Sequence, residues 1–204
     1  MERDKRQGRL GSCCAYGISK AFDTINYKLL IAKLRAYGFD LPSLEIIFDY
    51  FTNRQQRTKI NSSLSTLSLV LCGAAQGSIL GPKIFNINLN DLFFEFVDTD
   101  VCNIADDTTP FTCDTDIAKL LQNLESDVAS AIDWFAANFM ILNQEKCHFL
   151  ISGPETSLQQ MHIAVGEEVI WESSQEKLLG VLLDKLLNFH EHVIDICRKA
   201  SSKL

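Results

Sequence analysis

Two adjacent aspartates, Asp106 and Asp107, lie between two short segments with strand character, Val101–Ala105 and Thr108–Cys113. This pattern predicts a β-hairpin with both carboxylates at its tip. Neighbouring carboxylates repel one another, and a divalent cation that prefers oxygen ligands, such as Mg²⁺, relieves that repulsion. Aspartate is also common in solvated turns, so the pair by itself fits either a metal site or an ordinary turn.

Helical and strand patterns alternate along the rest of the chain without a strict βαβ order. The spacing of apolar residues predicts helices near residues 27–37, 42–51, 78–94, 116–139 and 190–203. Further strands are predicted at residues 12–18, 57–60, 67–72, 146–152, 162–165, 168–171 and 178–183. The longest helix has an apolar stripe that is expected to pack on a sheet. The mixture predicts an α+β fold in which helices cover one face of a sheet.

The composition excludes several classes of protein. Hydrophobic residues make up 47% of the chain and charged residues 22%, which is typical of a folded protein and not of a disordered one. No apolar run reaches the roughly 18 residues that span a bilayer, and the first six residues are too polar for a signal peptide. We therefore expect an intracellular protein, in nucleus or cytoplasm, without a membrane partner. The net charge of −7 excludes a surface that attracts nucleic acid everywhere, but it leaves room for a local basic groove.

The seven cysteines form no recognisable metal or disulfide pattern. Their number is odd and no Cys-x-x-Cys pair occurs, so buried free thiols in a reducing compartment are expected in place of a structural zinc. His190 and His192 are two residues apart, whereas a zinc-protease helix needs its two histidines four apart. These residues therefore predict no zinc centre.

A second chemical pattern lies between Gln76 and Pro82, where two glycines and a proline occur among seven residues. Such a loop is expected to turn tightly into the helix after it, and a helix N-terminus favours anionic groups such as a triphosphate. The Gln76 amide and free backbone N–H groups are then available to a ligand. The loop is not a Walker loop, because no Gly-Lys-Ser/Thr sequence follows. An ordinary junction of loop and helix would not require a glutamine inside the glycine turn.

Together and in this order, these motifs resemble the reverse transcriptases of non-LTR retrotransposons of the LINE and jockey-like kind. The resemblance covers the chain from about Ile18 to its end. The matching stretches are Ser19–Asp23, Tyr37–Phe39, Asn53–Arg57, Gln76–Pro82, Asn90–Leu92, Ala105–Thr108, Trp134, Leu142-Asn143, Lys146-Cys147 and Leu179–Val181. The ordered set is specific for this family, although each stretch alone is weak evidence of membership.

The resemblance implies the palm of an RNA-directed DNA polymerase, an antiparallel sheet of the ferredoxin-like, split βαβ kind, with two Mg²⁺ ions as cofactors. Asp106 and Asp107 match the metal-binding catalytic pair of this family. Lys146 matches a general acid that protonates the leaving pyrophosphate. The hairpin with the two aspartates is then expected in the middle of the sheet, beside the strand over residues 12–18.

The resemblance also implies sites for the substrates. Phe22 matches an aromatic gate that selects deoxynucleotides, and Gln76 and Gly77 match the loop that touches the dNTP. Leu179 and Gly180 match the turn that grips the primer. The implied partners are a dNTP, an RNA template and a DNA primer.

One departure from the family concerns the chemistry itself. The first palm motif of the family begins with an aspartate two residues before the serine, and this aspartate is the third metal ligand; here the position is Gly17. Asp23 lies six residues further on and is not expected to substitute. Ala75 and Ile104 also depart, at positions where the family usually has proline and an aromatic residue. We therefore expect impaired Mg²⁺ binding and an inactive polymerase.

Two alternatives to an inactive polymerase remain. One is a non-catalytic palm remnant that binds a protein or nucleic acid, and the other is an intact enzyme completed by a partner chain. Primer extension with the missing parts restored distinguishes an enzyme from a binding module.

We expect one palm domain fragment over residues 1–204. Residues 1–16 are expected to form a stretch outside the family plus the first strand, and residues 186–204 the start of the thumb. The fingers are expected to be missing and the thumb truncated. With a net charge of −7, this chain is expected to bind a primer–template weakly, through few cations such as Arg54, Arg57 and Lys59.

Overall fold

The chain forms two compact units in the computed structural model, which describes residues 10–18, 21–75, 77–153, 160–165 and 168–202. The first unit comprises residues 1–17, 94–133 and 142–204, and the second comprises residues 18–93 and 134–141. Each unit has its own buried side chains. The single palm domain expected over residues 1–204 stays a prediction.

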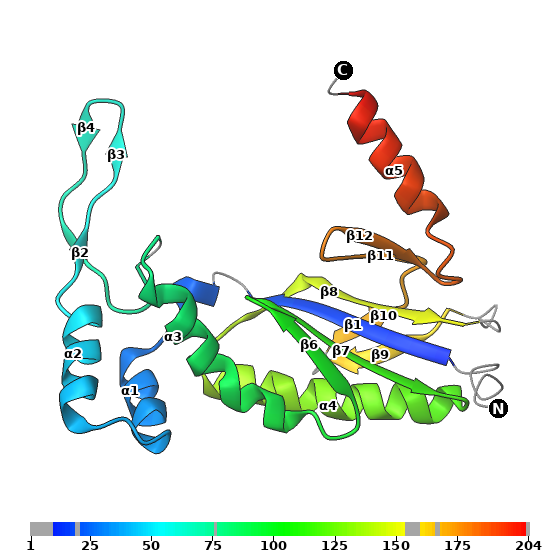
Figure 1. The fold of residues 1–204 in the computed structure, drawn as a ribbon, viewed down its shortest axis with the longest axis horizontal. Coiled ribbons are helices and arrows are strands. Elements are labelled where there is room, and N and C mark those ends of the chain that lie inside the picture. Colours follow the sequence, from blue (N-terminus) through cyan, green and yellow to red (C-terminus); the bar gives the residue numbers. More distant parts are fainter. Residues whose placement is uncertain (1–9, 19–20, 76, 154–159, 166–167, 203–204) are drawn as a thin grey trace. The chain divides into compact units, whose positions relative to one another are not determined.

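A four-stranded sheet lies at the centre of the first unit (Figure 1). Its strands follow the order β6 (Asp100–Ile104), β7 (Asp107–Asp114), β1 (Leu10–Ile18) and β8 (Leu142–Ser152). β7 pairs antiparallel with both β6 and β1. The predicted hairpin lies beside the predicted first strand, and the mixed α+β class with antiparallel pairing is confirmed. The expected place in the middle of the sheet is wrong, because β6 forms one edge of the described sheet and only β7 has a neighbour on both sides.

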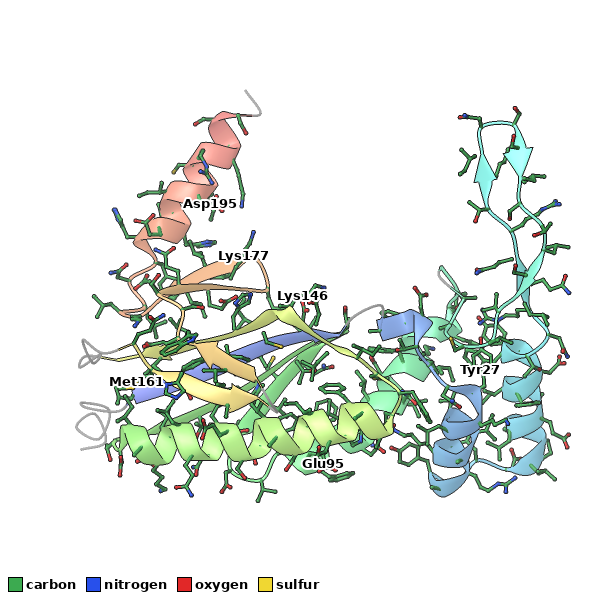
Figure 2. All side chains as sticks on the ribbon, turned by 180° about the vertical axis from the view of Figure 1, so that it is seen from behind. Tyr27, Glu95, Lys146, Met161, Lys177 and Asp195 are labelled. Carbon is green, nitrogen blue, oxygen red and sulfur yellow. The ribbon has the colours of Figure 1, made fainter. Side chains whose placement is uncertain are left out.

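The longest described helix, α4 (Ile117–Ala137), runs along one face of this sheet within the first unit (Figures 1 and 2). Leu120 and Leu124 of its predicted apolar stripe are fully buried. Asp127, on the same helix, is also buried and accepts hydrogen bonds from the backbone N–H and the hydroxyl of Thr99, at 2.7 and 2.8 Å. Those bonds compensate for the burial of its carboxylate and attach α4 to the start of β6. None of the helices in the described part of the chain is long and apolar enough to cross a membrane.

Two further hairpins and a helix complete the described part of the first unit. They are β9 (His162–Val165) with β10 (Glu168–Trp171), β11 (Gln175–Leu178) with β12 (Val181–Asp184), and α5 (His190–Ser201). The single strand predicted over residues 178–183 is wrong. Leu179 and Gly180 both have positive φ, 50° and 87°, and these values reverse the chain direction between β11 and β12.

The second unit is mainly helical in its described part. Its elements are η1 (Ala21–Asp23), α1 (Tyr27–Ala36), α2 (Leu41–Phe51) and α3 (Leu80–Leu89), followed by the 3₁₀ helix η2 (Asn90–Glu95) at the boundary with the first unit. Asn26 and Asp40 cap α1 and α2, because their side chains accept hydrogen bonds from backbone N–H groups of the first turn. The helix predicted over residues 78–94 is thus an α-helix for only part of its length. Since α3 belongs to the second unit, its expected packing on the sheet stays a prediction.

A β-ribbon connects α2 to the loop before α3 (Figure 1). It consists of β2 (Gln55–Gln56) paired with β5 (Ser68–Leu69) and β3 (Lys59–Ile60) paired with β4 (Ser63–Leu64). The hairpin predicted here is present, but its returning strand begins at Ser63 and not at Leu67. The turn itself was predicted at residues 61–63, and Asn61 has φ 53° there. It is so tight that Ser63 already pairs with Ile60, and the returning strand therefore begins before the apolar run.

A buried lysine links α1 to the end of α3 in the second unit. Lys33 donates hydrogen bonds to the backbone oxygen of Asn88 at 2.8 Å and to Asp91 at 2.7 Å, and its ammonium lies 4.4 Å from the ring centre of Trp134. Burial lowers the pKa of Lys33, and the hydrogen bond and charge of Asp91 oppose that shift. The charge is therefore kept in the interior by its partners.

Asp91→Asn should lower the free energy of unfolding by about 2 kcal/mol, since it leaves the buried charge of Lys33 without its counterion. Lys33→Met should cost less, because it removes the buried charge itself. The loss in free energy of unfolding caused by Asp91→Asn should become smaller as the pH rises toward 10.5. The reason is that Lys33 in the folded chain releases its proton at a lower pH than it does in the unfolded chain. Urea denaturation of both variants at several pH values measures this, and a larger deficit for Lys33→Met would contradict it.

Candidate active site

The hairpin between β6 and β7 carries Asp106 in its two-residue turn and Asp107 at the first position of the returning strand, one residue from the predicted tip. Ile104 pairs with Asp107, so Ala105 and Asp106 form the turn and Asp107 begins β7. Asp106 is half-buried and Asp107 is exposed. Ala105 has φ 56°, a left-handed conformation that residues with a Cβ atom seldom adopt. The chain therefore accepts backbone strain at the turn that presents the two carboxylates.

The register of β1 against β7 decides what faces these carboxylates. Gly17 is directly opposite Asp107, and Tyr16 is opposite Thr108. Cα atoms of directly opposed residues in antiparallel strands lie about 5 Å apart. Position 17, where the resembled family has an aspartate, is thus next to the aspartate pair, but glycine offers no side chain there.

Lys146 is on the strand at the other side of β1. Gly11 accepts a hydrogen bond from the Ser152 hydroxyl at 3.3 Å, and the Cys13 thiol interacts with the backbone of Leu150. The two contacts show that β8 runs antiparallel to β1, as Figure 1 also shows. Lys146 lies six positions before Ser152 and Gly17 six positions after Gly11, so Lys146 is at the Gly17 end of the sheet. Its side chain is exposed, as Figure 2 shows.

The residues at this end of the sheet do not fit a centre for two magnesium ions. Among the described residues, no three histidine, cysteine, aspartate or glutamate side chains are grouped so that they could hold a metal ion. Two Mg²⁺ ions carry four positive charges, and carboxylates must offset them before substrate phosphates arrive. Here both carboxylates come from one hairpin, and the neighbouring strand contributes none.

The buried cysteines nearby are unsuited to metal binding. Burial raises the pKa of Cys13 and of Cys147 to about 11, and it also raises the pKa of the fully buried Cys14. Metal ions bind thiolates, and these thiols stay protonated at neutral pH.

Phe22 and the loop that starts at Gly73 lie together in the second unit. The N–H of Ala74 donates to the backbone oxygen of Phe22 at 2.7 Å, and the N–H of Gly73 donates to that of Ile25 at 2.9 Å. The Phe22 ring stacks on Phe85 of α3, with 4.3 Å between ring centres. The structure thus brings the predicted aromatic gate next to the loop that precedes the predicted dNTP contacts.

Of those dNTP contacts, Gln76 lies outside the described residues. Gly77 is exposed and has φ 81°, with no atom within 4 Å of the place where a Cβ would be. The predicted primer grip, Leu179 and Gly180, forms the exposed turn between β11 and β12 in the first unit. β11 lies beside β8, the strand of Lys146.

Arg54 holds the Gly73 loop in place, a role that the sequence analysis missed. Its guanidinium donates to the backbone oxygen of Gly73, to the Tyr27 hydroxyl at 2.6 Å and to the backbone oxygen of Phe51 at 3.2 Å. Tyr27 also donates to the oxygen of Gly73, at 3.0 Å. The ends of α1 and α2 and the Gly73 loop therefore meet at one guanidinium. The expected role of Arg54 as a free cation for nucleic acid does not agree with these bonds.

The fold and these sites allow a comparison with known proteins. A family model described as reverse transcriptase (RNA-dependent DNA polymerase) matches residues 5–183. The chain belongs to the reverse transcriptase family. The matched region begins before Ile18, where the motifs were expected to begin, and ends before α5. Residues 5–183 therefore belong to the family, including the stretch before residue 17 that was expected to lie outside it.

Similar proteins are encoded by non-LTR retrotransposons, which confirms the jockey-like resemblance. The chain is 28% identical over 152 residues to the Pol polyprotein of the type-1 retrotransposable element R2 of Popillia japonica, covering 69% of the chain and 24% of that protein. It is 24% identical over 195 residues to the RNA-directed DNA polymerase from mobile element jockey of Drosophila melanogaster, covering 92% of the chain and 21% of that polymerase. The chain thus spans about a fifth to a quarter of the length of the curated relatives it matches.

Solved structures of telomerase share the fold. Telomerase from Candida tropicalis in complex with the TWJ fragment of telomeric RNA superposes with a TM-score of 0.63 at 12% identity, covering 91% of this chain and 30% of telomerase. Apo telomerase from the same organism, truncated from its C-terminal domain, gives a TM-score of 0.60 at 11% identity, covering 91% of this chain and 36% of that telomerase chain. At this identity the likeness concerns the fold of the chain and not its activity.

Ala105→Gly should raise the free energy of unfolding by about 0.5–1 kcal/mol, because glycine adopts positive φ without the Cβ penalty. Ala129→Gly, at an exposed position within α4, should lower it by about 1 kcal/mol. Urea denaturation followed by circular dichroism measures both. A loss of stability in both variants would show that the Asp106 turn is not strained at Ala105.

Gly73→Ala should lower the free energy of unfolding by about 2–4 kcal/mol. Gly73 has φ 85°, and an added Cβ would lie 2.7 Å from the Cα of Asp23. Gly38→Ala is the matched control, since Gly38 has φ 89° but no atom within 4 Å of the added Cβ, so its loss should be only about 1 kcal/mol. Equal losses in urea denaturation would argue against the tight packing of the Gly73 loop on η1.

Proposed function

We propose that this chain is the palm fragment of a non-LTR retrotransposon reverse transcriptase that no longer catalyses nucleotide addition. The observation that carries the proposal is the register that puts Gly17 opposite Asp107. In the family, carboxylates from two neighbouring strands offset the charge of two magnesium ions. This chain keeps the carboxylates of one strand only, so the ions that polarise the primer hydroxyl and the leaving pyrophosphate are not held.

The other family roles are proposed at the matching positions. Lys146 is proposed as the general acid, Phe22, Gln76 and Gly77 as dNTP contacts, and Leu179 and Gly180 as the primer grip, with an RNA template and a DNA primer as partners. The position of Lys146 at the Gly17 end of the sheet supports its proposed role. The hydrogen bond from Ala74 to Phe22 supports the dNTP gate, because it ties the gate to the Gly73 loop.

The test places residues 5–183 of this chain within the remaining domains of an active jockey-type enzyme and measures primer extension on an RNA template with Mg²⁺. The unmutated chimera should show no measurable extension. Gly17→Asp should restore activity to at least about 100-fold above that background, since loss of a direct metal ligand outweighs the 10–100-fold effect of an outer-shell partner. Gly17→Asn is the matched control, similar in size but uncharged, and should stay inactive.

Adding Asp107→Asn to the Gly17→Asp chimera should abolish extension again, because the restored centre needs carboxylates from both strands. Equal extension by the unmutated chimera and the Gly17→Asp chimera would overturn the proposed loss of catalysis.

A second candidate function is a remnant that binds nucleic acid without chemistry. The observation that favours it is a segment with no acidic residue in an otherwise acidic chain. This segment runs from Tyr50 to Asn90 and contains the ribbon of the second unit.

A further inference from the structure

Charge is distributed very unevenly along this chain. The segment from Tyr50 to Asn90 contains four basic residues and no aspartate or glutamate. The rest of the chain holds the other fifteen basic residues and all twenty-six acidic ones, so it has a net charge of −11. Two copies of this chain therefore do not repel one another at every surface, because the basic segment of one copy attracts the acidic remainder of another.

The ribbon tip, defined here as residues 57–65, presents cations beside aliphatic side chains (Figure 1). Lys59 of β3 pairs directly with Leu64 of β4, so these two side chains share one face of the ribbon. Lys59 and Arg57 are exposed, and Leu64 and Ile60 are 51% and 68% exposed. Packing within the second unit therefore explains neither the cations nor the aliphatic groups of the tip.

An open cavity of about 650 Å³ in the first unit has the complementary character. Strands β1, β6, β7 and β8 contribute to its lining, together with Leu178 and Leu183 of the β11–β12 hairpin. Among the described residues that line it, Asp98 and Asp100 are the only charged ones, and lysine, arginine and histidine do not occur there. The cavity is therefore suited to an apolar group that carries positive charge at its edge.

The exposed part of the cavity lining places a carboxylate beside apolar side chains. Asp100 of β6 pairs directly with Phe111 of β7, so these two side chains share one face of the sheet. Phe111, Leu187 and Val97 are 42%, 45% and 82% exposed, and Asp98 and Asp100 are exposed as well. Large apolar side chains gathered in water around a cavity indicate a surface that a partner covers.

The ribbon tip and the cavity match in charge and in arrangement. Each surface has a charged side chain directly opposite an apolar one on a neighbouring strand, with positive charge on the tip and negative charge at the cavity. None of the four charged side chains forms an ion pair within the described residues; they are Arg57, Lys59, Asp98 and Asp100. Contact between the two surfaces would therefore form ion pairs without breaking existing ones, and it would cover apolar groups on both sides.

We propose that the ribbon tip of one copy of this chain docks into the cavity of a second copy. Arg57 and Lys59 then lie at Asp98 and Asp100, and the aliphatic side chains of the tip enter the cavity. The two surfaces differ, so the contact is heterologous and one copy presents both of them. The tip is small, and interfaces below about 1,200 Å² are weak and transient, so we expect association at micromolar and higher concentrations. This self-association goes beyond the proposed polymerase fragment, since it involves neither the aspartate pair nor nucleic acid.

The test measures sedimentation velocity of the full, nuclease-treated chain from about 1 to about 200 µM at low salt. The average mass should rise with concentration, and added salt should weaken the association because it screens exposed charges. A chain that stays monomeric over this range would overturn the proposal. Association that nuclease treatment removes would also overturn it, because nucleic acid and not the cavity would then join the copies.

A ribbon variant, Arg57→Glu with Lys59→Glu, should raise the dissociation constant about 30-fold, because two attractive charge pairs become repulsive ones. Its control, Lys28→Glu with Arg35→Glu, changes the net charge by the same amount at exposed positions of α1 and should change the dissociation constant less than about threefold. Equal effects of the two double variants would show that only net charge matters and would overturn the proposal.

A cavity variant, Asp98→Lys with Asp100→Lys, should weaken association to the same extent as the ribbon variant. Its control is Glu45→Lys with Asp49→Lys, which makes the same change in charge at exposed positions of α2 and should have little effect. Unchanged association of the cavity variant would contradict docking at this cavity.

Mixing the ribbon variant with the cavity variant tests whether the two surfaces bind each other. Each variant alone should stay monomeric where the unmutated chain associates, since each has lost one surface. The mixture should form a complex of one copy of each, because the intact cavity of the ribbon variant accepts the intact tip of the cavity variant. A chain with all four substitutions should associate again, because its charges are exchanged. Absence of a complex in the mixture would overturn the proposal.

Leu64→Ser should weaken association of the otherwise unmutated chain about tenfold, since it removes apolar area that docking takes out of water. Ile46→Ser, at a 71% exposed position of α2, is the matched control and should have no effect. Equal association of both variants would overturn the entry of aliphatic side chains into the cavity. None of these measurements involves turnover, so they are independent of the Gly17 experiment.

Discussion

The antiparallel pairing of β1 with β7 is the constraint on which the functional interpretation depends. It fixes which residues meet at one end of the sheet, because a shift of one residue would move every side chain to the other face. In the observed register Gly17 is opposite Asp107, and the Asp106 turn closes the same end. The sheet of this reverse transcriptase family member therefore forms with a glycine opposite Asp107. A fold of this kind depends on strand pairing and buried apolar residues, and neither needs the missing carboxylate.

A different interaction organises the second unit. One guanidinium, that of Arg54, joins α1, α2 and the Gly73 loop, and Gly73 in turn packs against the backbone of Asp23. Buried polar groups of this kind need nearly all their hydrogen bonds to be satisfied, so they hold a loop in one conformation. The loop is kept next to Phe22 without any contribution from the aspartate pair. The bonds of Arg54 and the packing of Gly73 therefore hold the scaffold of the proposed nucleotide contacts without any contribution from Gly17.

Local patterns predicted most elements of this protein, and the failures have local causes. The stripe of Leu120 and Leu124 predicted α4, and the flanking apolar segments predicted the aspartate hairpin. The turn at Asn61 was predicted, but the returning strand of the ribbon begins at Ser63, earlier than expected. The apolar pattern missed the reversal between β11 and β12, because Leu179, which adopts positive φ, lies in an apolar run. Arg54 was taken for a surface cation because its partners, Tyr27 and Gly73, are 27 and 19 residues away in the sequence.

The sequence by itself determined the family, the aspartate pair and the glycine at position 17, because these are properties of ordered motifs and of single residues. It also contains the acid-free segment from Tyr50 to Asn90. Only the tertiary structure decided that Gly17 faces Asp107, that Arg54 is engaged, and that Arg57 and Lys59 are exposed. Register, burial and hydrogen bonding depend on residues distant along the chain. They are fixed only when strands pair and side chains pack, so a local sequence pattern does not predict them.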